Sequence, residues 1–310
     1  MPPLTPRALG RATLARQLLL ERVARPVLGV VGDLVGLQAQ VPRVPHLALW
    51  DRVAGYDPAE LDALMTSRQV VRTPLMRTTI HTVPADDALA LRPLLQPVLD
   101  RTFASTAWGQ RLRGQDVGAV VAEAAGLLGE RPMGRAELQR ELARRHPGLD
   151  AEAVASCVSY SVPWVQPTPR GLWAASRAAV MTTVDAWLGG RAVPPATPED
   201  LLVRYLRAFG PATVRDAQVW CGLTRLREAA DRLGSRLRRL PTTDGGEVLD
   251  VPDGPLPDPD TPAPVRFLAE YDNVTLSHAD RSRVVADADH VPLPGGPGGW
   301  TGSVLVDGRV

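Results

Sequence analysis

Two glutamines, Gln38 and Gln40, lie one residue apart in the stretch "LVGLQAQVPR". An amide side chain does not titrate, so neither residue is an ordinary general acid or base. Taken alone, such a pair is typical of polar residues that cap a helix end or contact solvent. A catalytic interpretation depends on what the rest of the chain supplies.

The composition excludes several kinds of chemistry. All 35 basic residues are arginine, since no lysine occurs. The chain therefore has no Walker A lysine, no lysine for a PLP Schiff base and no lysine nucleophile. Cys157 and Cys221 are isolated, without metal-ligand spacing or a disulfide framework. With no apolar run long enough for a membrane span and no signal peptide, the sequence predicts a cytoplasmic protein without cofactor or metal.

The charge is unevenly distributed although its total is near zero. Residues 1–50 contain six arginines and two acidic residues, and residues 201–250 contain nine arginines and six acidic residues. Residues 251–310 reverse the balance, with four arginines and nine acidic residues. A neutral chain with local basic surfaces can still bind a polyanion through one face.

The elements that must position the glutamines form similar units, separated by prolines and glycines. Residues 194–262 read as three helices capped by Thr197, Thr213 and Thr224, then a hairpin around "TDGGE". That order is the winged-helix pattern. Residues 113–193 read the same way, with a hairpin in "WVQPTPRGLWAAS" whose tip is "TPRG".

The first unit, residues 1–112, is more elaborate, and its wing is predicted in "VVRTPLMRTTIHTV". Gln38 and Gln40 fall in the turn before its recognition-type helix, which is the part of a helix-turn-helix that faces DNA. Residues 263–310 form a partial β element, and its last strand, in "WTGSVLVDGRV", has no expected partner. The fold class predicted is α+β, mainly α.

Four motifs resemble one family in their order: "GLQAQVPRVPHLALWDR", "VVRTPLMRTTIHTVPADD", "WVQPTPRGLWAASRA" and "FLAEYDNVTLSHADRSRV". The family is the AlkZ/YcaQ-type winged-helix DNA glycosylases of bacteria. The resemblance implies three winged-helix units around a curved DNA-binding channel and a C-terminal β-barrel, which would be truncated here. Gln38 and Gln40 match its Gln-x-Gln branch. That branch includes self-resistance enzymes that unhook interstrand crosslinks, so repair or genotoxin resistance is an implied role.

The resemblance agrees with the chemistry of an amide pair. A purine alkylated at N7 or N3 is cationic and already a good leaving group, so it needs no general acid. Amide carbonyls would orient a water and present a negative dipole to the oxocarbenium-like sugar. Because the chain lacks lysine, strand cleavage through an imine would need the N-terminal amine, exposed at Pro2 after loss of Met1. That end reads as a mobile tail, so a monofunctional glycosylase is expected.

The resemblance also implies residues that line the DNA channel: Arg43, Arg72, Arg77, His81, His278, Arg281 and Arg283. Each has the alternative of a solvated, internally paired or structural side chain. Asp51 is expected to be an ion-pair partner of Arg52 or a neighbour on a helix surface. The alternative function is a non-catalytic winged-helix regulator. Such a regulator would be a dimer that reads a palindrome, whereas the glycosylase, acting on double-stranded DNA with alkylated purines, would be a monomer.

Overall fold

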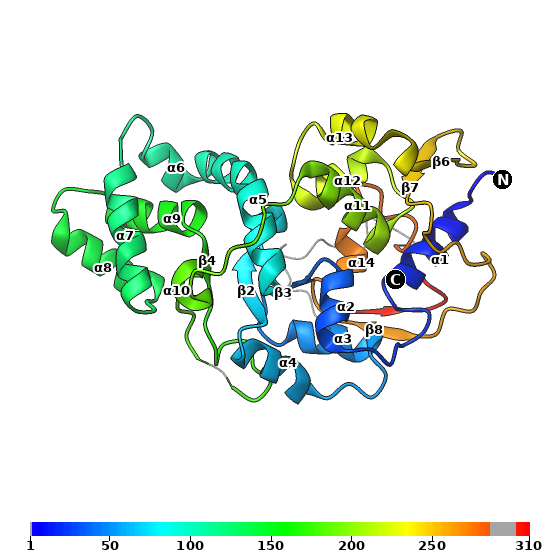
Figure 1. Ribbon diagram of the computed structural model, residues 1–310, viewed down its shortest axis with the longest axis horizontal. Coiled ribbons are helices and arrows are strands. Elements are labelled where there is room, and N and C mark those ends of the chain that lie inside the picture. Colours follow the sequence, from blue (N-terminus) through cyan, green and yellow to red (C-terminus); the bar gives the residue numbers. More distant parts are fainter. Residues whose placement is uncertain (1, 176, 286–301) are drawn as a thin grey trace.

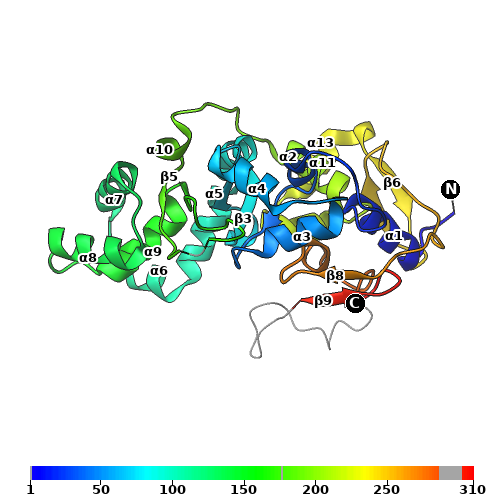
Figure 2. The ribbon, with the colours of Figure 1, turned by 90° about the horizontal axis from the view of Figure 1, so that it is seen from below.

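The computed structural model describes residues 2–175, 177–285 and 302–310, which form an elongated α+β molecule (Figure 1). The helices around residues 107–161 occupy one end, and residues 198–250 occupy the other end together with the N-terminus (Figures 1 and 2). The segment with the two glutamines lies between them. The described residues contain no closed barrel.

The first helix packs on a segment that lies far along the chain. Helix α1 (Pro6–Arg16) packs on α11 (Pro198–Phe209). A buried ion pair, Arg16 Nη1 to Asp250 Oδ1 at 2.6 Å, fixes the contact. Leu4 adds a backbone hydrogen bond to Pro241 O at 2.8 Å. Residues 4–16 therefore pack on the segment that the sequence had assigned to the third unit.

A three-stranded sheet holds the centre of the molecule, in the order β1-β3-β2. Its elements run from the second helix to a long helix that follows the sheet: α2 (Val27–Asp33), β1 (Leu37–Gln38), α3 (Val44–Arg52), α4 (Pro58–Thr66), β2 (Val70–Pro74), β3 (Ile80–Pro84) and α5 (Ala85–Ser105). The predicted wing is thus the β2–β3 hairpin. Gln38 is not in a free turn, because it pairs with His81 across β1 and β3.

The next segment forms a separate helical group with its own buried apolar cluster. Its elements are α6 (Ala107–Arg111), α7 (Gly118–Glu130), α8 (Arg135–Arg145), α9 (Ala151–Ser161), β4 (Trp164–Val165), β5 (Thr182–Thr183) and α10 (Val184–Leu188). The hairpin predicted around "TPRG" is wrong, since β4 pairs with β5 instead. After β4 the chain leaves to contact the central segment, where Gln166 N donates to Arg72 O at 2.9 Å.

Residues 198–250 match the predicted element order closely. They form α11, α12 (Val214–Cys221), α13 (Leu226–Leu233), β6 (Arg238–Pro241) and β7 (Glu247–Asp250). Capping boxes at Thr197 and Thr213 confirm two predicted helix starts. The third helix start is not at Thr224, because α13 follows Arg225 without a side-chain cap. Buried apolar residues of α5 and of α11–α13 belong to one cluster, so the central and third segments share a core.

The C-terminal residues pair with a strand from the same end of the chain. Strand β8 (Arg266–Leu268) is antiparallel to β9 (Ser303–Leu305). The expectation that the final strand lacks a partner was wrong. A short helix, α14 (Asn273–Leu276), follows β8 and returns the chain to the centre of the molecule.

Candidate functional site

Gln38 and Gln40 meet at a cavity of about 510 Å³ between the central segment, α12 and the chain after β8. Its lining contains amides, hydroxyls, guanidinium groups and an imidazole, but no carboxylate from the described residues: Gln38, Gln40, Arg77, Thr79, Val219, Tyr271, Thr275, Leu276, His278, Ala279 and Arg281. Five residues predicted for the site therefore come together here, from sequence positions as distant as 38 and 281.

The loop that carries the glutamines is held by its backbone. Gly36 adopts a φ of +87°, and a Cβ there would lie 2.3 Å from Val83 Cγ1, so only glycine fits. The chain then enters β1, and Ala39 N donates to Ile80 O at 2.7 Å. Residues i and i+2 of an extended chain face the same side. Gln38 and Gln40 therefore reach the same cavity.

Arg72 fixes the far side of this loop. Its Nη2 donates to Ala39 O at 2.8 Å and its Nη1 to Pro42 O at 3.3 Å. The same guanidinium donates to Gln166 Oε1, at 3.1 Å from Nη2. With 1% of its surface exposed, Arg72 cannot contact a phosphate in this conformation. The expected DNA contact is replaced by a positioning role in the loop.

The orientation of both amides follows from their partners. Arg77 Nη2 donates to Gln38 Oε1 at 2.8 Å, and Ile80 N donates to Gln40 Oε1 at 2.9 Å. A guanidinium and a backbone N–H are only donors, so the bonded atom of each glutamine must be the carbonyl oxygen. Each carbonyl oxygen is thus held by a donor from the β2–β3 hairpin.

Arg77 lies at the tip of the β2–β3 hairpin in a left-handed backbone conformation, with φ 52° and ψ 23°. Besides Gln38, it donates from Nη1 to Trp220 O at 2.8 Å, which ties the hairpin to α12. Burial lowers the pKa of Arg77 to about 10, so the guanidinium stays charged at neutral pH.

Both predicted histidines are buried and neutral. Burial, reinforced by the charge of Arg77, lowers the pKa of His81 to about 3, and its Nδ1 donates to Thr79 O at 2.8 Å. Burial also holds the pKa of His278 well below its usual value. His278 Nε2 donates to Phe209 O at 3.1 Å and its Nδ1 accepts from Ser277 Oγ at 2.9 Å. Neither imidazole is therefore charged at neutral pH. His278 lines the cavity with the glutamines, and His81 does not.

The other predicted arginines line different cavities. Arg281 lines the cavity with the glutamines. Arg43 is exposed and lines a smaller cavity of about 140 Å³, together with Arg170 and Arg177. Arg283 is 8% exposed, and its Nη1 donates to Pro211 O at 2.8 Å. Arg283 is thus mainly a structural donor, and a phosphate contact by Arg43 or Arg281 stays a prediction.

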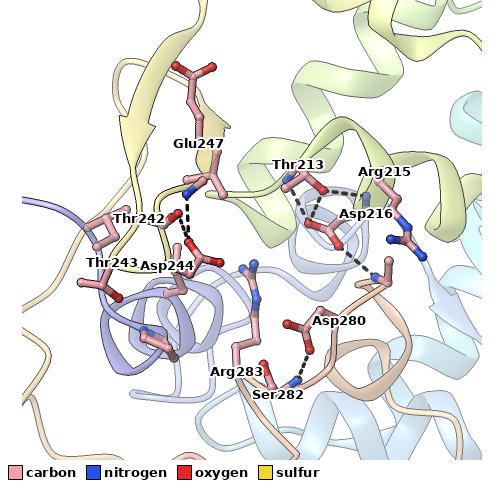
Figure 3. A pocket seen from close by; sticks show the side chains of 16 residues that line it. Thr213, Arg215, Asp216, Thr242, Thr243, Asp244, Glu247, Asp280, Ser282 and Arg283 are labelled. Carbon is pink, nitrogen blue, oxygen red and sulfur yellow. Dashed lines mark hydrogen bonds between the residues drawn. The ribbon is translucent and has the colours of Figure 1, made fainter.

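Arg283 lines a third cavity, of about 500 Å³, between α1, the β6–β7 hairpin and the start of α12 (Figure 3). The carboxylates in this cavity accept hydrogen bonds from protein groups. Asp216 accepts from Thr213 Oγ1 at 2.8 Å and from Ala279 N at 2.9 Å, and Asp280 accepts from Ser282 N at 2.9 Å. The carboxylates of the cavity shown in Figure 3 therefore stabilise the local structure.

Asp51 is not on a helix surface. Its side chain is fully buried, and neither carboxylate oxygen has a hydrogen-bond partner among the described residues. Arg52 turns away and pairs with Asp272 through two bonds of 2.8 Å. Burial raises the pKa of Asp51 to about 6. Asp51 does not line the cavity with the glutamines.

The hydroxyl groups of the site were not among the predicted residues. Tyr271, Thr79 and Thr275 line the cavity, although "EYDN" and "RTTIHT" were both within noted motifs. Thr79 lies two residues from both Arg77 and His81 in the sequence, which was an available signal. No group of three or more His, Cys, Asp or Glu residues suited to a metal occurs in the described part of the chain. Among the described helices, none is long and apolar enough to span a membrane.

Comparisons with known proteins agree on one family. Residues 31–310 match the profile described as "DNA glycosylase AlkZ-like". The structure resembles the Streptomyces sahachiroi DNA glycosylase AlkZ with a TM-score of 0.78 and 20% sequence identity, covering 99% of this chain and 87% of that one. No curated protein matches the chain in sequence. At this identity the structural likeness shows the fold, and the profile match shows the family.

Proposed function

Since the chain belongs to the AlkZ-like DNA glycosylase family, we propose that it removes cationic N7- or N3-alkylated purines from double-stranded DNA. The family makes it a hydrolase of N-glycosyl bonds in DNA. The proposal concerns the lesion and the residues. Gln38 and Gln40 carry the reaction, and the enzyme is a monomer that works in the cytoplasm, on the nucleoid, without a cofactor.

The observation that supports this proposal is the set of residues that line the cavity with the glutamines. No Asp or Glu of the described residues reaches it, and its histidine is neutral. A neutral base would need a proton from a general acid before it could leave. A purine that is already cationic leaves without one. The site therefore suits bases that alkylation has activated.

The proposed division of the chain follows the sequence: winged-helix units at 1–112, 113–193 and 194–262, and a partial C-terminal β element at 263–310. Arg281, in the cavity with the glutamines, and Arg43, in another cavity, would contact phosphates. Interstrand crosslinks at N7 are included in the proposed substrates, because each half is itself a cationic alkylpurine.

The test is incubation with duplex DNA that contains one N7-methylguanine, followed by detection of abasic sites. The wild type should release the base, and Gln38→Ala or Gln40→Ala should lower the rate by roughly 10²–10³-fold with little change in DNA affinity. Gln115→Ala, at an exposed position outside the cavity, is the control. A protein that binds DNA as a dimer and releases no base would be the regulator instead.

The product should be an intact strand with an abasic site, because the chain has no lysine to form an imine. Borohydride added during reaction with abasic-site DNA should trap no covalent complex. A trapped adduct that disappears when Pro2 is blocked would move the nucleophile to the N-terminus and make the enzyme bifunctional.

A further inference from the structure

We propose that Gln38 and Gln40 act as hydrogen-bond donors to the departing purine, at the edge formed by its N9 and N3 atoms. This inference rests on the proposed function and narrows it: the site takes a base that presents acceptor atoms beside the glycosidic bond. Among the proposed substrates these are the N7-alkylated purines, because N3 of an N3-alkylated purine carries the alkyl group and accepts no hydrogen bond. The donor role differs from a role in which amide carbonyls hold the attacking water.

The first support is the fixed orientation of the amides. Gln38 Oε1 accepts from Arg77, and Gln40 Oε1 accepts from Ile80 N. Turning the Gln38 amide over would direct its NH₂ group at the charged guanidinium of Arg77 and leave a guanidinium N–H without an acceptor. Each amide therefore keeps its oxygen toward the β2–β3 hairpin and its nitrogen away from it.

The second support is the state of the two nitrogens. Neither Gln38 Nε2 nor Gln40 Nε2 has a hydrogen-bond partner among the described residues, yet neither is sealed in the interior. Gln38 is 5% exposed and Gln40 is exposed, and both line the cavity. The amide N–H groups are thus the unpaired hydrogen-bonding groups that the pair offers to a bound base.

The third support is the charge around them. Arg77 and Arg281 line the same cavity, and no carboxylate of the described residues does. The positive charges of this lining disfavour a cationic purine ring and favour a purine ring that gains the electron pair of the breaking bond. The lining therefore favours the change that the base undergoes during cleavage.

The chemistry balances without a protein acid. The C1′–N9 bond breaks, its electron pair stays on N9, and the cationic purine leaves as a neutral base. A water oxygen bonds to C1′ and releases one proton to solvent. The in-plane pair on N9 exists only as the bond breaks, next to the pair already on N3. Donors aimed at that edge therefore bind the transition state more strongly than the substrate.

The donor role explains why both positions are occupied by glutamine. A glutamate at either position would keep an oxygen for Arg77 or for Ile80 N but would have no N–H to donate. Gln38→Glu and Gln40→Glu therefore separate the two roles of the amide. If the carbonyl oxygens promote the reaction, the two glutamate variants preserve or increase the excision rate. If the N–H groups promote it, the glutamate variants lose excision.

The experiment compares these variants on duplex DNA with one N7-methylguanine, in single turnover. Both glutamate variants should lose roughly 10²–10³-fold in rate, as the alanine variants do. Gln218→Glu is the matched control, because Gln218 Oε1 also accepts a backbone N–H, from Leu226 at 3.1 Å, and lies outside the cavity. It should keep the wild-type rate. Thermal denaturation and affinity for undamaged DNA check that each variant is folded.

A second arm changes the substrate and uses the wild-type protein, so it does not depend on a variant that folds. Replacing N3 of N7-methylguanine by C–H removes one acceptor. The wild-type rate, divided by the spontaneous release rate of each base, should fall at least tenfold. The same change should cost the alanine variants little, since the interaction is already absent.

Wild-type excision by both glutamate variants, or an N3 replacement without effect on the normalised rate, would overturn the donor role while leaving glycosylase activity intact. If the wild type releases no alkylated base at all, the proposed function itself fails. The two failures are therefore distinguishable.

Discussion

Replacing Asp51 by asparagine should stabilise the protein above pH 6 and leave its stability unchanged near pH 4. Burial raises the pKa of this carboxyl from 3.8 to about 6. Arg52, Arg22 and Arg266 oppose the shift and Asp272 adds to it. Above the folded-state value, the native protein holds a buried carboxylate with no hydrogen-bond partner among the described residues.

The sign and size follow from proton linkage. Below pH 3.8 the carboxyl is protonated in both states and contributes nothing. Between pH 3.8 and about 6 the unfolded chain has lost the proton and the native one has not, so stability falls as pH rises. A difference of about two pKa units corresponds to roughly 3 kcal/mol, reached above pH 6.

The assay is denaturant unfolding of wild type and Asp51→Asn from pH 4 to 8, with Asp231→Asn, at an exposed position on α13, as control. The Asp51 variant should gain up to about 3 kcal/mol at pH 7.5, and the control should gain almost nothing at any pH. Base excision at pH 7.5 should be retained, because Asp51 lies outside the cavity. A pH-independent difference would refute the buried-carboxylate argument, and lost excision in a stable variant would give Asp51 a catalytic supporting role.

Three further predictions concern the fold and the DNA-binding surface. Gly36→Ala should lower stability by roughly 1–3 kcal/mol in thermal unfolding, because its Cβ would meet Val83 at a φ of +87°; an unchanged midpoint contradicts this. Arg52→Leu should cost roughly 3–5 kcal/mol by leaving Asp272 charged and buried, and adding Asp272→Leu should recover part of the loss. Affinity for undamaged duplex should fall by roughly 0.9 log unit per log unit of salt for each phosphate neutralised. An affinity indifferent to salt would exclude arginine–phosphate binding.

Local sequence signals predicted the third segment well. The capping boxes at Thr197 and Thr213 involve side chains three residues apart, and the β6–β7 hairpin closes over a short glycine-containing turn. Everything that determines these elements lies within a few residues. The same kind of signal located the β2–β3 hairpin.

Pairings between distant residues were not predictable in this way. The strand after Trp164 pairs with Thr182–Thr183, and the strand at Arg266 pairs across a separation of more than thirty residues with Ser303–Leu305. Nothing local sets either register. The burial of Asp51 has the same origin, because α3 contacts β8, which the sequence places more than two hundred residues later.

The orientation of the two amides is the clearest feature of the site that the motif could not predict. "QAQ" identifies two amides but not which end of each faces the substrate. That choice is made by Arg77, whose other hydrogen bond goes to Trp220 of α12, and by the β1–β3 pairing that presents Ile80 N. The polarity of the pair is therefore a property of the contact between the central and third segments.

Arginine suits this arrangement in a way that lysine would not. The planar guanidinium of Arg72 reaches Ala39 O, Pro42 O and Gln166 Oε1 at once, and so joins the glutamine loop to the chain after β4. Arg77 joins the other side of the loop to α12. The two glutamines thus lie where three segments of the chain meet, and each segment contributes a hydrogen bond that holds the loop. The side-chain oxygens of both glutamines already accept a hydrogen bond from the protein. Their amide N–H groups have no partner among the described residues, so these donors are the groups that the pair offers to the substrate.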